Sequence, residues 1–326
     1  MVRFDESPFT VVTSALAYPE GPVWRPDGSV LVCEVKGGTL TRVAPEGTTS
    51  VVATLGGSPN GAAIGPDGAV YVCNSGGFTF IPIGPVWVTG DQPPDYVGGS
   101  IQRVDPAGQV TTLYRQSTDA TGAARPLRGP DDLVFDATGS FWFSDWGKSR
   151  PRDRDITGVH YAKADGSSCR EVIFPLAAPN GIALSPDGSR LYVAETYTRR
   201  ILYYELLGPG QIARNPRTLD GSHLLTAAIP GQGILDSMAV DEEGNVYAAT
   251  MLPDGADPTA NGGLTIVTPS GEVVQFLEID IGTPVPLPSN LCFGGPDRRT
   301  AFITCGGTGQ LVSVRMKVAG APRAFE

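Results

Sequence analysis

The sequence repeats one short pattern six times, and this repeat limits the folds that the chain can adopt. Each copy starts with a polar residue, continues as a short apolar strand, turns, and returns as a second apolar or aromatic strand. Five copies turn at Asp-Gly, Thr-Gly or Glu-Gly and the sixth at Pro296-Asp297, which is typical of β-hairpins. The copies cover residues 20–34, 60–74, 131–145, 180–195, 236–250 and 290–305.

A second hairpin follows each of the first five copies, as in TLTRVAPEGTTSVVATL (39–55). The units begin about every 54 residues. Six units of four antiparallel strands predict an all-β fold, a six-bladed β-propeller. After the sixth copy only one strand follows, QLVSVRMKV (310–318), so we expect FTVVTSALA (9–17) to supply the missing strand. Pairing of the N- and C-terminal strands would close the ring and remove two exposed edges, making 1–326 a single propeller domain.

The composition agrees with a turn-rich β protein and narrows the choice of partners. With 42 Gly and 29 Pro residues, few stretches are long enough for a helix. The formal charge of −10 argues against nucleic acid or an acidic membrane as a partner. No apolar run reaches membrane-spanning length, and the start MVRFDESPF lacks the features of a signal peptide. We therefore expect a cytoplasmic protein, a monomer or weak homo-oligomer, that binds a small molecule.

The second unit carries an insertion, residues 77–99, that is rich in aromatic residues, Pro and Gly. Phe78, Phe80, Ile83, Trp87 and Tyr96 would be poor choices for a loop exposed to solvent on all sides. We interpret the insertion as an apolar lid over a ligand site, with an ordinary surface excursion as the alternative.

The first residue of each repeat copy is an oxygen donor. In a propeller the first strand of each blade lines the central channel, and all six first strands begin on the same face. These residues therefore form a ring around one mouth, which we call the oxygen ring: Glu20, Asn60, Asp131, Asn180, Asp236 and Asn290.

Three carboxylates and three amides that converge on a channel predict a bound cation. The carboxylates would repel one another unless a positive charge neutralised them. Ca²⁺ takes six to eight oxygen ligands and is the expected ion, with Zn²⁺, Mn²⁺ and Mg²⁺ as alternatives. Asn60 and Asn290 also fit a plain turn role, because Asn before a bend tolerates a left-handed backbone. Glu20 has no such local explanation.

The ring is the part of the sequence that resembles a known family. The motifs are EGPVW (20–24), DDLVFDATGSFWFSDWG (131–147), PNGIALSPDGSRLYVAET (179–196), DSMAVDEEGNVYAA (236–249) and SNLCFGGPDRRTAFIT (289–304). In this order they resemble the gluconolactonase, regucalcin (senescence marker protein) and luciferin-regenerating-enzyme group. The resemblance covers nearly the whole chain.

This resemblance implies a six-bladed propeller with one divalent metal ion in its channel. The ligands that it implies are Glu20, Asp131, Asn180 and Asp236. Two positions depart from the usual pattern: Asp131 stands where Asn is common, and Asp236-Ser237 replaces the common Asp-Gly. The second departure is similar to lactonases of the drug-responsive type. Three carboxylates overcompensate a divalent ion, which leaves the metal preference open.

The expected function is that of a metal-dependent lactonase. The metal would polarise the lactone carbonyl, and Asp236 would act as general base toward water, with Asp131 as the alternative base. An organophosphate or phosphotriester hydrolase would need the same groups and is the second hypothesis. A non-catalytic propeller that binds a metal or a small molecule is the third. Further residues expected to contact substrate are Asn60, Asp132, Ser237, Asn290 and Glu195.

Other catalytic chemistries find little support in the sequence. The motifs of serine hydrolases, zinc proteases and nucleotide-binding loops are absent. We expect both histidines, His160 and His223, at the surface or in turns. The five cysteines form no C-x-x-C motif, and three of them end apolar strands, so we expect reduced and partly buried thiols.

Overall fold

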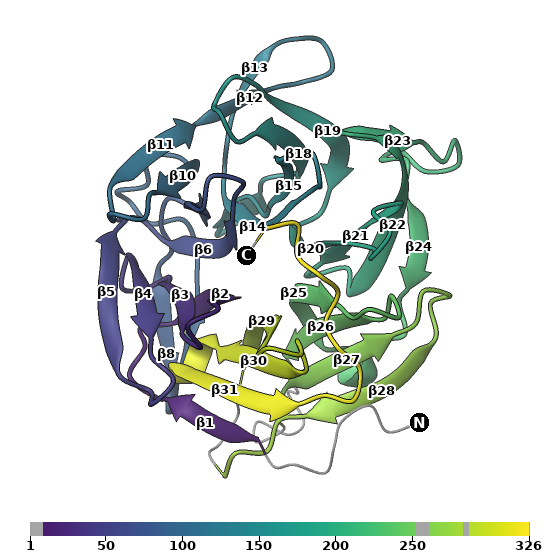
Figure 1. Cartoon of the computed structure of the whole chain (residues 1–326). Helices are drawn as coiled ribbons and strands as arrows, with labels where there is room; N and C mark the ends of the chain where they lie inside the picture. Colours follow the sequence, from purple (N-terminus) through teal and green to yellow (C-terminus); the bar gives the residue numbers. More distant parts are fainter. Residues whose placement is uncertain (1–8, 252–260, 283–286, 326) are drawn as a thin grey trace.

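The computed structural model describes residues 9–251, 261–282 and 287–325. Six sheets of four or more strands surround a common axis (Figure 1). The six-bladed β-propeller predicted from the repeat is thereby confirmed. Each repeat copy forms the two strands of a blade that lie nearest the axis, and the hairpins between the copies form the outer strands.

Each blade runs from an innermost strand at the axis to a strand at the outer edge. The first blade contains β2 (Pro19–Trp24), β3 (Val30–Glu34), β4 (Thr39–Val43) and β5 (Thr49–Thr54). The second contains β6 (Pro59–Ile64), β7 (Val70–Asn74), β10 (Ser100–Val104) and β11 (Val110–Tyr114). The third contains β14 (Pro130–Phe135), β15 (Ser140–Asp145), β18 (Thr157–Lys163) and β19 (Cys169–Leu176), with the short strands β12 (Gln116–Thr118) and β13 (Ala124–Pro126) outside β19. The fourth contains β20 (Pro179–Leu184), β21 (Arg190–Glu195) and β22 (Arg200–Gly208), and both β23 (Gln211–Ala213) and β24 (His223–Thr226) pair with β22. The fifth contains β25 (Ile234–Val240), β26 (Val246–Met251), β27 (Gly263–Val267) and β28 (Val273–Glu278). The sixth contains β29 (Pro288–Gly294), β30 (Thr300–Cys305), β31 (Gln310–Arg315) and β1 (Thr10–Thr13).

The sixth blade combines both ends of the chain. Strand β1 pairs antiparallel with β31, and Thr10 lies opposite Ser313. Strand β1 falls within the segment 9–17 that the sequence offered as the missing strand, and it occupies the outer edge of this blade. The last blade therefore contains three C-terminal strands and one N-terminal strand.

The turn between β20 and β21 shows why the repeat forms hairpins. Gly188 has φ +68°, a left-handed conformation that glycine adopts without strain. The preceding Asp187 accepts hydrogen bonds at Oδ1 from the backbone N–H and the hydroxyl of Ser189, at 3.0 and 2.8 Å. The Asp-Gly pair thus fixes the reversal locally, before any contact with another blade forms.

The core of the protein lies between the blades. The buried apolar side chains of the described residues form six clusters, and each cluster joins two neighbouring blades. Tyr247 of the fifth blade, for example, packs edge-to-face on Phe293 of the sixth, with ring centroids 5.3 Å apart. Because both faces of each sheet are covered in this way, the blades stabilise one another around the ring.

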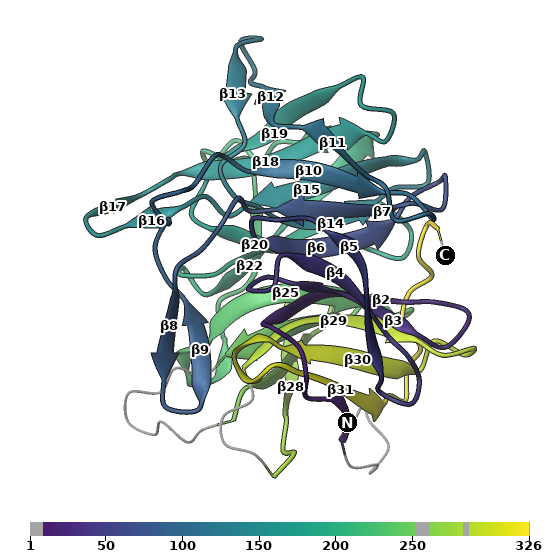
Figure 2. The same cartoon turned by 90° about the vertical axis from the view of Figure 1, so that its left-hand side faces the viewer.

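The two faces of the disc differ in what covers them. Hairpin β8 (Phe80–Ile83) and β9 (Val86–Thr89), within the insertion, projects on one side, together with β16 (Ser149–Arg150) and β17 (Asp153–Arg154) (Figure 2). The described C-terminal end lies on the other side. There Phe325 packs on Phe135 with centroids 5.7 Å apart. The insertion and the C-terminus thus mark opposite mouths.

Buried side chains correct one expectation from the sequence. His160 lies in β18, only 3% exposed, and stacks on Phe143 with centroids 4.8 Å apart, so its predicted surface position is wrong. Burial lowers the pKa of His160 to about 3. All five cysteines are buried and unpaired, as expected for reduced thiols. Within the part of the chain that the structure covers, no helix has the length and apolar character to cross a membrane.

Candidate metal centre and active site

Most of the oxygen ring meets in one small cavity at the mouth that carries the insertion. Glu20, Asn60 and Asp131 line this cavity of about 170 Å³ together with Asn180 and Asp236. We call it the site cavity. Five of the six ring positions predicted from the repeat are therefore brought together.

The sixth ring residue lies slightly deeper. Asn290 lines a larger cavity of about 360 Å³, as does Asp132, and this cavity reaches the turns at the opposite mouth. Residues 321–325 of the C-terminal segment lie along it. Asn290 still contacts the ring, because its Nδ2 donates to Glu20 Oε2 at 3.0 Å.

The ring amides are oriented by hydrogen bonds to their neighbours. Asn60 Nδ2 donates to Asp131 Oδ2 at 3.2 Å. Asn180 Nδ2 donates to Thr196 Oγ1 at 3.2 Å, and Ser237 Oγ lies 3.5 Å from Asn180 Oδ1. The Asn60 nitrogen is thus bound by a neighbour while its oxygen is left for another partner, whereas Asn290 Oδ1 already accepts a hydrogen bond from Leu291 N at 2.7 Å.

Two buried oxygens of the ring lack a hydrogen-bond donor and could bind a cation instead. Asn60 Oδ1 and Asp131 Oδ1 are buried and have no hydrogen-bond partner among the described residues. A buried oxygen without a donor is costly, and a hard cation supplies the missing partner. No three His, Cys, Asp or Glu side chains in the described ranges are arranged to hold a metal ion. A cation would therefore need the amide oxygens as ligands, and these donors fit Ca²⁺ better than a dedicated zinc site.

The carboxylates of the ring hold protons more tightly than usual. Burial raises the pKa of Glu20 to about 7. Burial, followed by the charge of Glu20, raises the pKa values of Asp131 and Asp236 well above the ordinary value. Asp132, below the ring, has its pKa raised to about 7 by burial. These directions describe the protein before a cation enters, because a cation would favour the charged carboxylates.

Asp236 differs from the other ring residues in its exposure. The side chains of Glu20, Asn60 and Asp131, like those of Asn180 and Asn290, are buried, whereas Asp236 is only half-buried. Of the three ring carboxylates, Asp236 is therefore the one that water reaches most easily.

The glycines after the ring residues permit close contact between neighbouring blades. A Cβ added at Gly61 would lie 2.6 Å from the backbone oxygen of Asp131. A Cβ at Gly181 would lie 2.8 Å from the backbone oxygen of Asp236 and 2.8 Å from the backbone nitrogen of Met238. Each such glycine lets one inner strand lie directly against the next ring residue, so the Asn-Gly pairs serve packing as well as chain direction.

We predict that Gly181→Ala lowers both stability and activity. The new methyl group would push β25 away and displace Asp236, at a cost of about 1–3 kcal/mol in stability and about tenfold in kcat/KM. Thermal unfolding and steady-state kinetics measure the two effects. Gly188→Ala is the control: its added Cβ meets open space, so it should cost stability through φ strain and leave kcat/KM unchanged. Equal turnover in the two variants would contradict the prediction.

The residues that end the second strands hold the inner strands in place. Glu34 accepts a hydrogen bond from Ala17 N at 2.6 Å, and Asn74 Oδ1 from Ser58 N at 3.1 Å. Asp145 Oδ1 accepts from Gly129 N at 2.7 Å. Each acceptor thus fixes the backbone two or three residues before a ring residue. The repeat predicts that these strand ends lie around the ring and can orient it, but the backbone N–H that each one binds depends on the register between the two strands.

Glu195 belongs to this set of acceptors. Its carboxylate accepts hydrogen bonds from Ala177 N at 2.7 Å and Thr198 Oγ1 at 2.6 Å, and it forms an ion pair with Arg200. Glu195 is fully buried and does not line the site cavity. Its expected substrate contact stays a prediction, and its visible contacts are within its own blade.

Apolar side chains surround the site cavity above the ring. Trp146 packs edge-to-face on Phe78 of the insertion, with centroids 5.8 Å apart, and lies near Tyr197 at 5.8 Å. The guanidinium of Arg154 stacks on both Trp146 and Tyr197, 4.6 and 4.7 Å from the centroids. We call the set that lines the cavity the apolar wall: Tyr18, Val35, Phe78, Val88, Trp146, Tyr197, Ile234 and Met251.

One charged residue near the site was missed by the sequence reasoning. Lys148 lies three residues after Asp145 and is fully buried. Burial lowers its pKa to about 7, against the opposing effect of Asp145 and Asp131. Lys148 occupies no repeated position, so comparing the six copies could not reveal it.

Comparisons with known proteins agree with this fold. Residues 18–307 match the family model described as SMP-30/Gluconolactonase/LRE-like region. A gluconolactonase of Zymomonas mobilis is 27% identical over 96% of this chain and 83% of its own. A lactonase drp35 of Staphylococcus saprophyticus is 35% identical, but over 36% of this chain and 35% of its own.

Solved structures show the same architecture. A gluconolactonase from Xanthomonas campestris superposes with a TM-score of 0.70 at 21% identity, covering 96% of this chain and 91% of that one. A calcium-binding regucalcin from Agrobacterium tumefaciens superposes with a TM-score of 0.70 at 16% identity, covering 97% of each chain. At these identities the structures establish the fold alone. The family model spans most of the chain, including every ring residue in the site cavity and the wall around them, and on this basis the protein belongs to the SMP-30/gluconolactonase/LRE-like family.

Proposed function

We propose that this protein is a divalent-metal-dependent lactonase. The observation that carries the proposal is the pair of buried, unpartnered oxygens, Asn60 Oδ1 and Asp131 Oδ1, in a ring whose carboxylates line the same cavity. The lactonase activity named for the family's gluconolactonases supports the choice of reaction. A small cyclic ester is also of a size suited to a cavity of about 170 Å³.

The proposed ligands of the cation are Glu20, Asp131, Asn180 and Asp236, and Ca²⁺ is the proposed ion. Since no three carboxylates of the described residues are arranged to hold a metal ion, the three in this set would have to move toward the cation when it binds. A bound cation would supply Lewis-acid polarisation of the ester carbonyl. The calcium-binding regucalcin among the structural neighbours is in keeping with this ion. Asn60 Oδ1 is a further oxygen on the same cavity, available either to the cation or to the substrate.

Asp236 is the proposed general base that accepts the proton of the attacking water. Its half-buried carboxylate is open to an incoming water molecule, and a bound cation would favour its ionised form, which can accept a proton. Asp131 is the alternative base but is buried and already accepts from Asn60. Ser237, the next residue along the chain, would help to orient Asn180. Asp132 and Asn290 line the deeper cavity and not the site cavity. We propose that they influence the substrate indirectly, by positioning the ring residues.

Removing the metal tests the proposal. The protein is stripped with a chelator, shown by circular dichroism to remain folded, and assayed on a panel of lactones before and after addition of Ca²⁺, Mn²⁺, Zn²⁺ or Mg²⁺. We expect activity to fall at least about 100-fold on stripping and to return with one of these ions. Equal rates in the stripped and loaded forms would contradict metal dependence. Faster turnover of a fluorophosphonate than of any lactone would favour a phosphotriesterase instead.

A further inference from the structure

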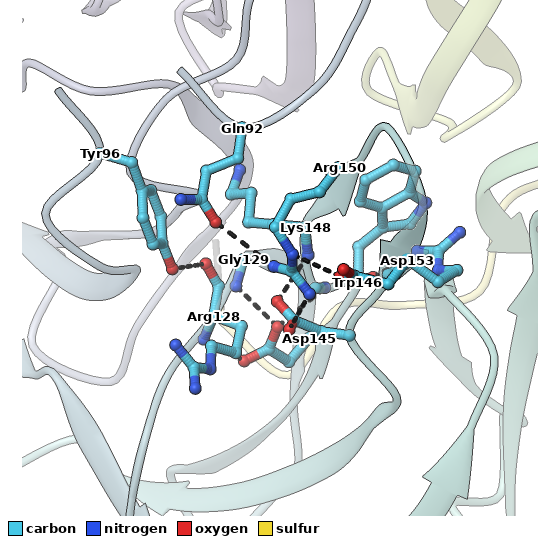
Figure 3. Close-up of polar contacts among 12 residues, drawn as sticks. Gln92, Tyr96, Arg128, Gly129, Asp145, Trp146, Lys148, Arg150 and Asp153 are labelled. Atoms are coloured by element: carbon cyan, nitrogen blue, oxygen red, sulfur yellow. Dashed lines mark hydrogen bonds and ion pairs between the residues drawn. The ribbon is translucent and has the colours of Figure 1, made fainter. Parts of the chain in front are cut away.

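The insertion is fastened to the third blade by a buried lysine. Lys148 Nζ donates a hydrogen bond to the backbone oxygen of Gly77 at 2.8 Å and lies 3.6 Å from the centroid of the Phe78 ring. Gly77 and Phe78 are the first two residues of the insertion. Figure 3 shows Lys148 among residues of the third blade, with Tyr96 and Gln92 of the insertion facing it.

Other polar contacts also join the insertion to the third blade. The Tyr96 hydroxyl donates to the backbone oxygen of Arg128. The backbone N–H of Gln92 donates to Ser149 O at 2.9 Å, and its side-chain oxygen lies 3.4 Å from Arg150 Nη1 (Figure 3). Gly77 and Gln92 of the insertion therefore contact the segment that follows β15, and Tyr96 contacts the segment that precedes β14.

The ammonium of Lys148 is placed for the insertion and not for the nearby carboxylate. Asp145 already accepts hydrogen bonds from the backbone N–H groups of Arg128, Gly129 and Gly147, at 2.7, 2.7 and 3.0 Å. In the described part of the chain, the Gly77 carbonyl is the hydrogen-bond acceptor of Lys148. The charges of Asp145 and Asp131 and the face of the Phe78 ring offset part of the cost of burying this ammonium, but the net effect of burial still lowers its pKa, so stability alone is a poor reason for a lysine here.

Phe78 connects this lysine to the site. It lines the site cavity together with Glu20 and Asp131, and its edge contacts Trp146. A shift of Gly77 would move Phe78 directly, because the two are adjacent in the chain. Most of the surface of the site cavity above the ring belongs to the apolar wall. Two threonines, Thr89 and Thr196, also line the cavity there.

We propose that Lys148 is a positioning residue that holds the insertion over the site and, through Phe78, makes the site select lactones with an apolar or aromatic substituent. The substrate part of this inference rests on the proposed lactonase function. The positioning part does not, and it is tested separately.

The first experiment measures the insertion itself. Lys148→Met keeps the length of the side chain and removes the ammonium. In the full chain we expect amide hydrogen exchange in residues 77–99 to become at least about tenfold faster, with the blades unchanged. Lys163→Met, at an exposed position of the same blade, is the matched control. Unchanged exchange in 77–99 would overturn the proposal. If Lys148→Met does not fold, Tyr96→Phe removes a different hydrogen bond between the insertion and the third blade. This variant must then show faster amide exchange that is confined to residues 77–99.

The second experiment measures selection between two lactones. An unsubstituted δ-lactone is compared with the same ring bearing an alkyl or phenyl group. For Lys148→Met we expect kcat/KM to fall about tenfold on the substituted lactone, mainly through KM, and less than about twofold on the unsubstituted one. Phe78→Ala should give the same pattern, and the double variant should lose no more than either single one.

The outcomes of the second experiment separate the two proposals. Equal losses on both lactones, or additive losses in the double variant, would overturn selection through Phe78. If the wild-type protein hydrolysed no lactone, the proposed function would fail, and the exchange experiment would still decide whether Lys148 holds the insertion.

Discussion

Asp236→Asn should lower kcat/KM for lactone hydrolysis by roughly 10³-fold in metal-saturated protein. The amide keeps the size of the side chain and one oxygen toward the cation, but it cannot accept a proton from water. Asp236 is the most exposed carboxylate of the ring, so no other ring acid reaches the incoming water equally well. Steady-state kinetics at saturating metal measures the effect. The loss of activity should appear in kcat, since the proton acceptor acts only in the chemical step.

Two further variants serve as a control for Asp236→Asn and as a test of the alternative base. Asp187→Asn makes the same change at a turn near the opposite mouth and should leave kcat/KM unchanged. Asp131→Asn introduces the amide that is common in the family and should cost less than about tenfold, since the proton acceptor remains. A larger loss in Asp131→Asn than in Asp236→Asn would assign the base to Asp131. Full activity in both variants would show that turnover does not depend on these carboxylates, and no turnover in the wild type or in either variant would favour a binding protein.

The metal-free protein should become less stable as the pH rises from about 5 to 7, by roughly 3 °C in Tm per pH unit. The folded protein raises the pKa values of Glu20 and Asp132 to about 7 and those of Asp131 and Asp236 well above the ordinary value. A raised acid pKa means that the folded state binds more protons than the unfolded chain. The stability that this provides is complete below the ordinary carboxyl pKa and is lost as the pH rises toward the raised values.

Two groups oppose the carboxylates, and the window limits both. His160 has its pKa lowered to about 3, so below its ordinary value of 6.5 it favours the folded state more as the pH rises, but it is one group against four. Lys148 has its pKa lowered to about 7, so it adds stability with rising pH only above this window. Carboxylates whose pKa is held low, such as those of Asp119 and Asp297, titrate well below this window.

Adding Ca²⁺ should reverse this behaviour. A cation binds the ionised ring best, so the gain in Tm should increase with pH and reach roughly 5 °C at about 100 times the dissociation constant. Glu20→Gln is the control: it should raise the Tm of the metal-free protein at pH 8 and weaken the effect of the metal. A metal-free Tm that rises between pH 5 and 7 would contradict the carboxylate cluster as its cause.

The parts of the fold that could be predicted are those that repeat. The Asp-Gly turns form from local hydrogen bonds, as at Asp187, and the apolar alternation marks the strands on either side. Comparing the copies then assigns Glu20, Asn60, Asp131, Asn180 and Asp236 to one mouth without any knowledge of tertiary contacts. This placement was possible because every inner strand starts at the same end of its blade.

The parts that could not be predicted depend on contacts between segments far apart in the sequence. Gly181 looks like a turn residue until its contact with Asp236 is known. Lys148 contacts the insertion, 71 residues away, and occurs once. His160 is buried because Phe143 on the neighbouring strand covers it. Each of these features follows from packing between strands or blades, which a single copy of the repeat does not encode.

The burial of all five cysteines makes the protein well suited to spectroscopic labelling. Burial raises the pKa values of all five thiols, from Cys33 to Cys305, so thiol reagents should find little reactive thiolate in the folded protein. A single cysteine introduced at Ile81, which is 50% exposed on the insertion hairpin, would then carry a fluorophore or spin label without background. Opening of the mouth during turnover could be recorded directly in an otherwise native chain.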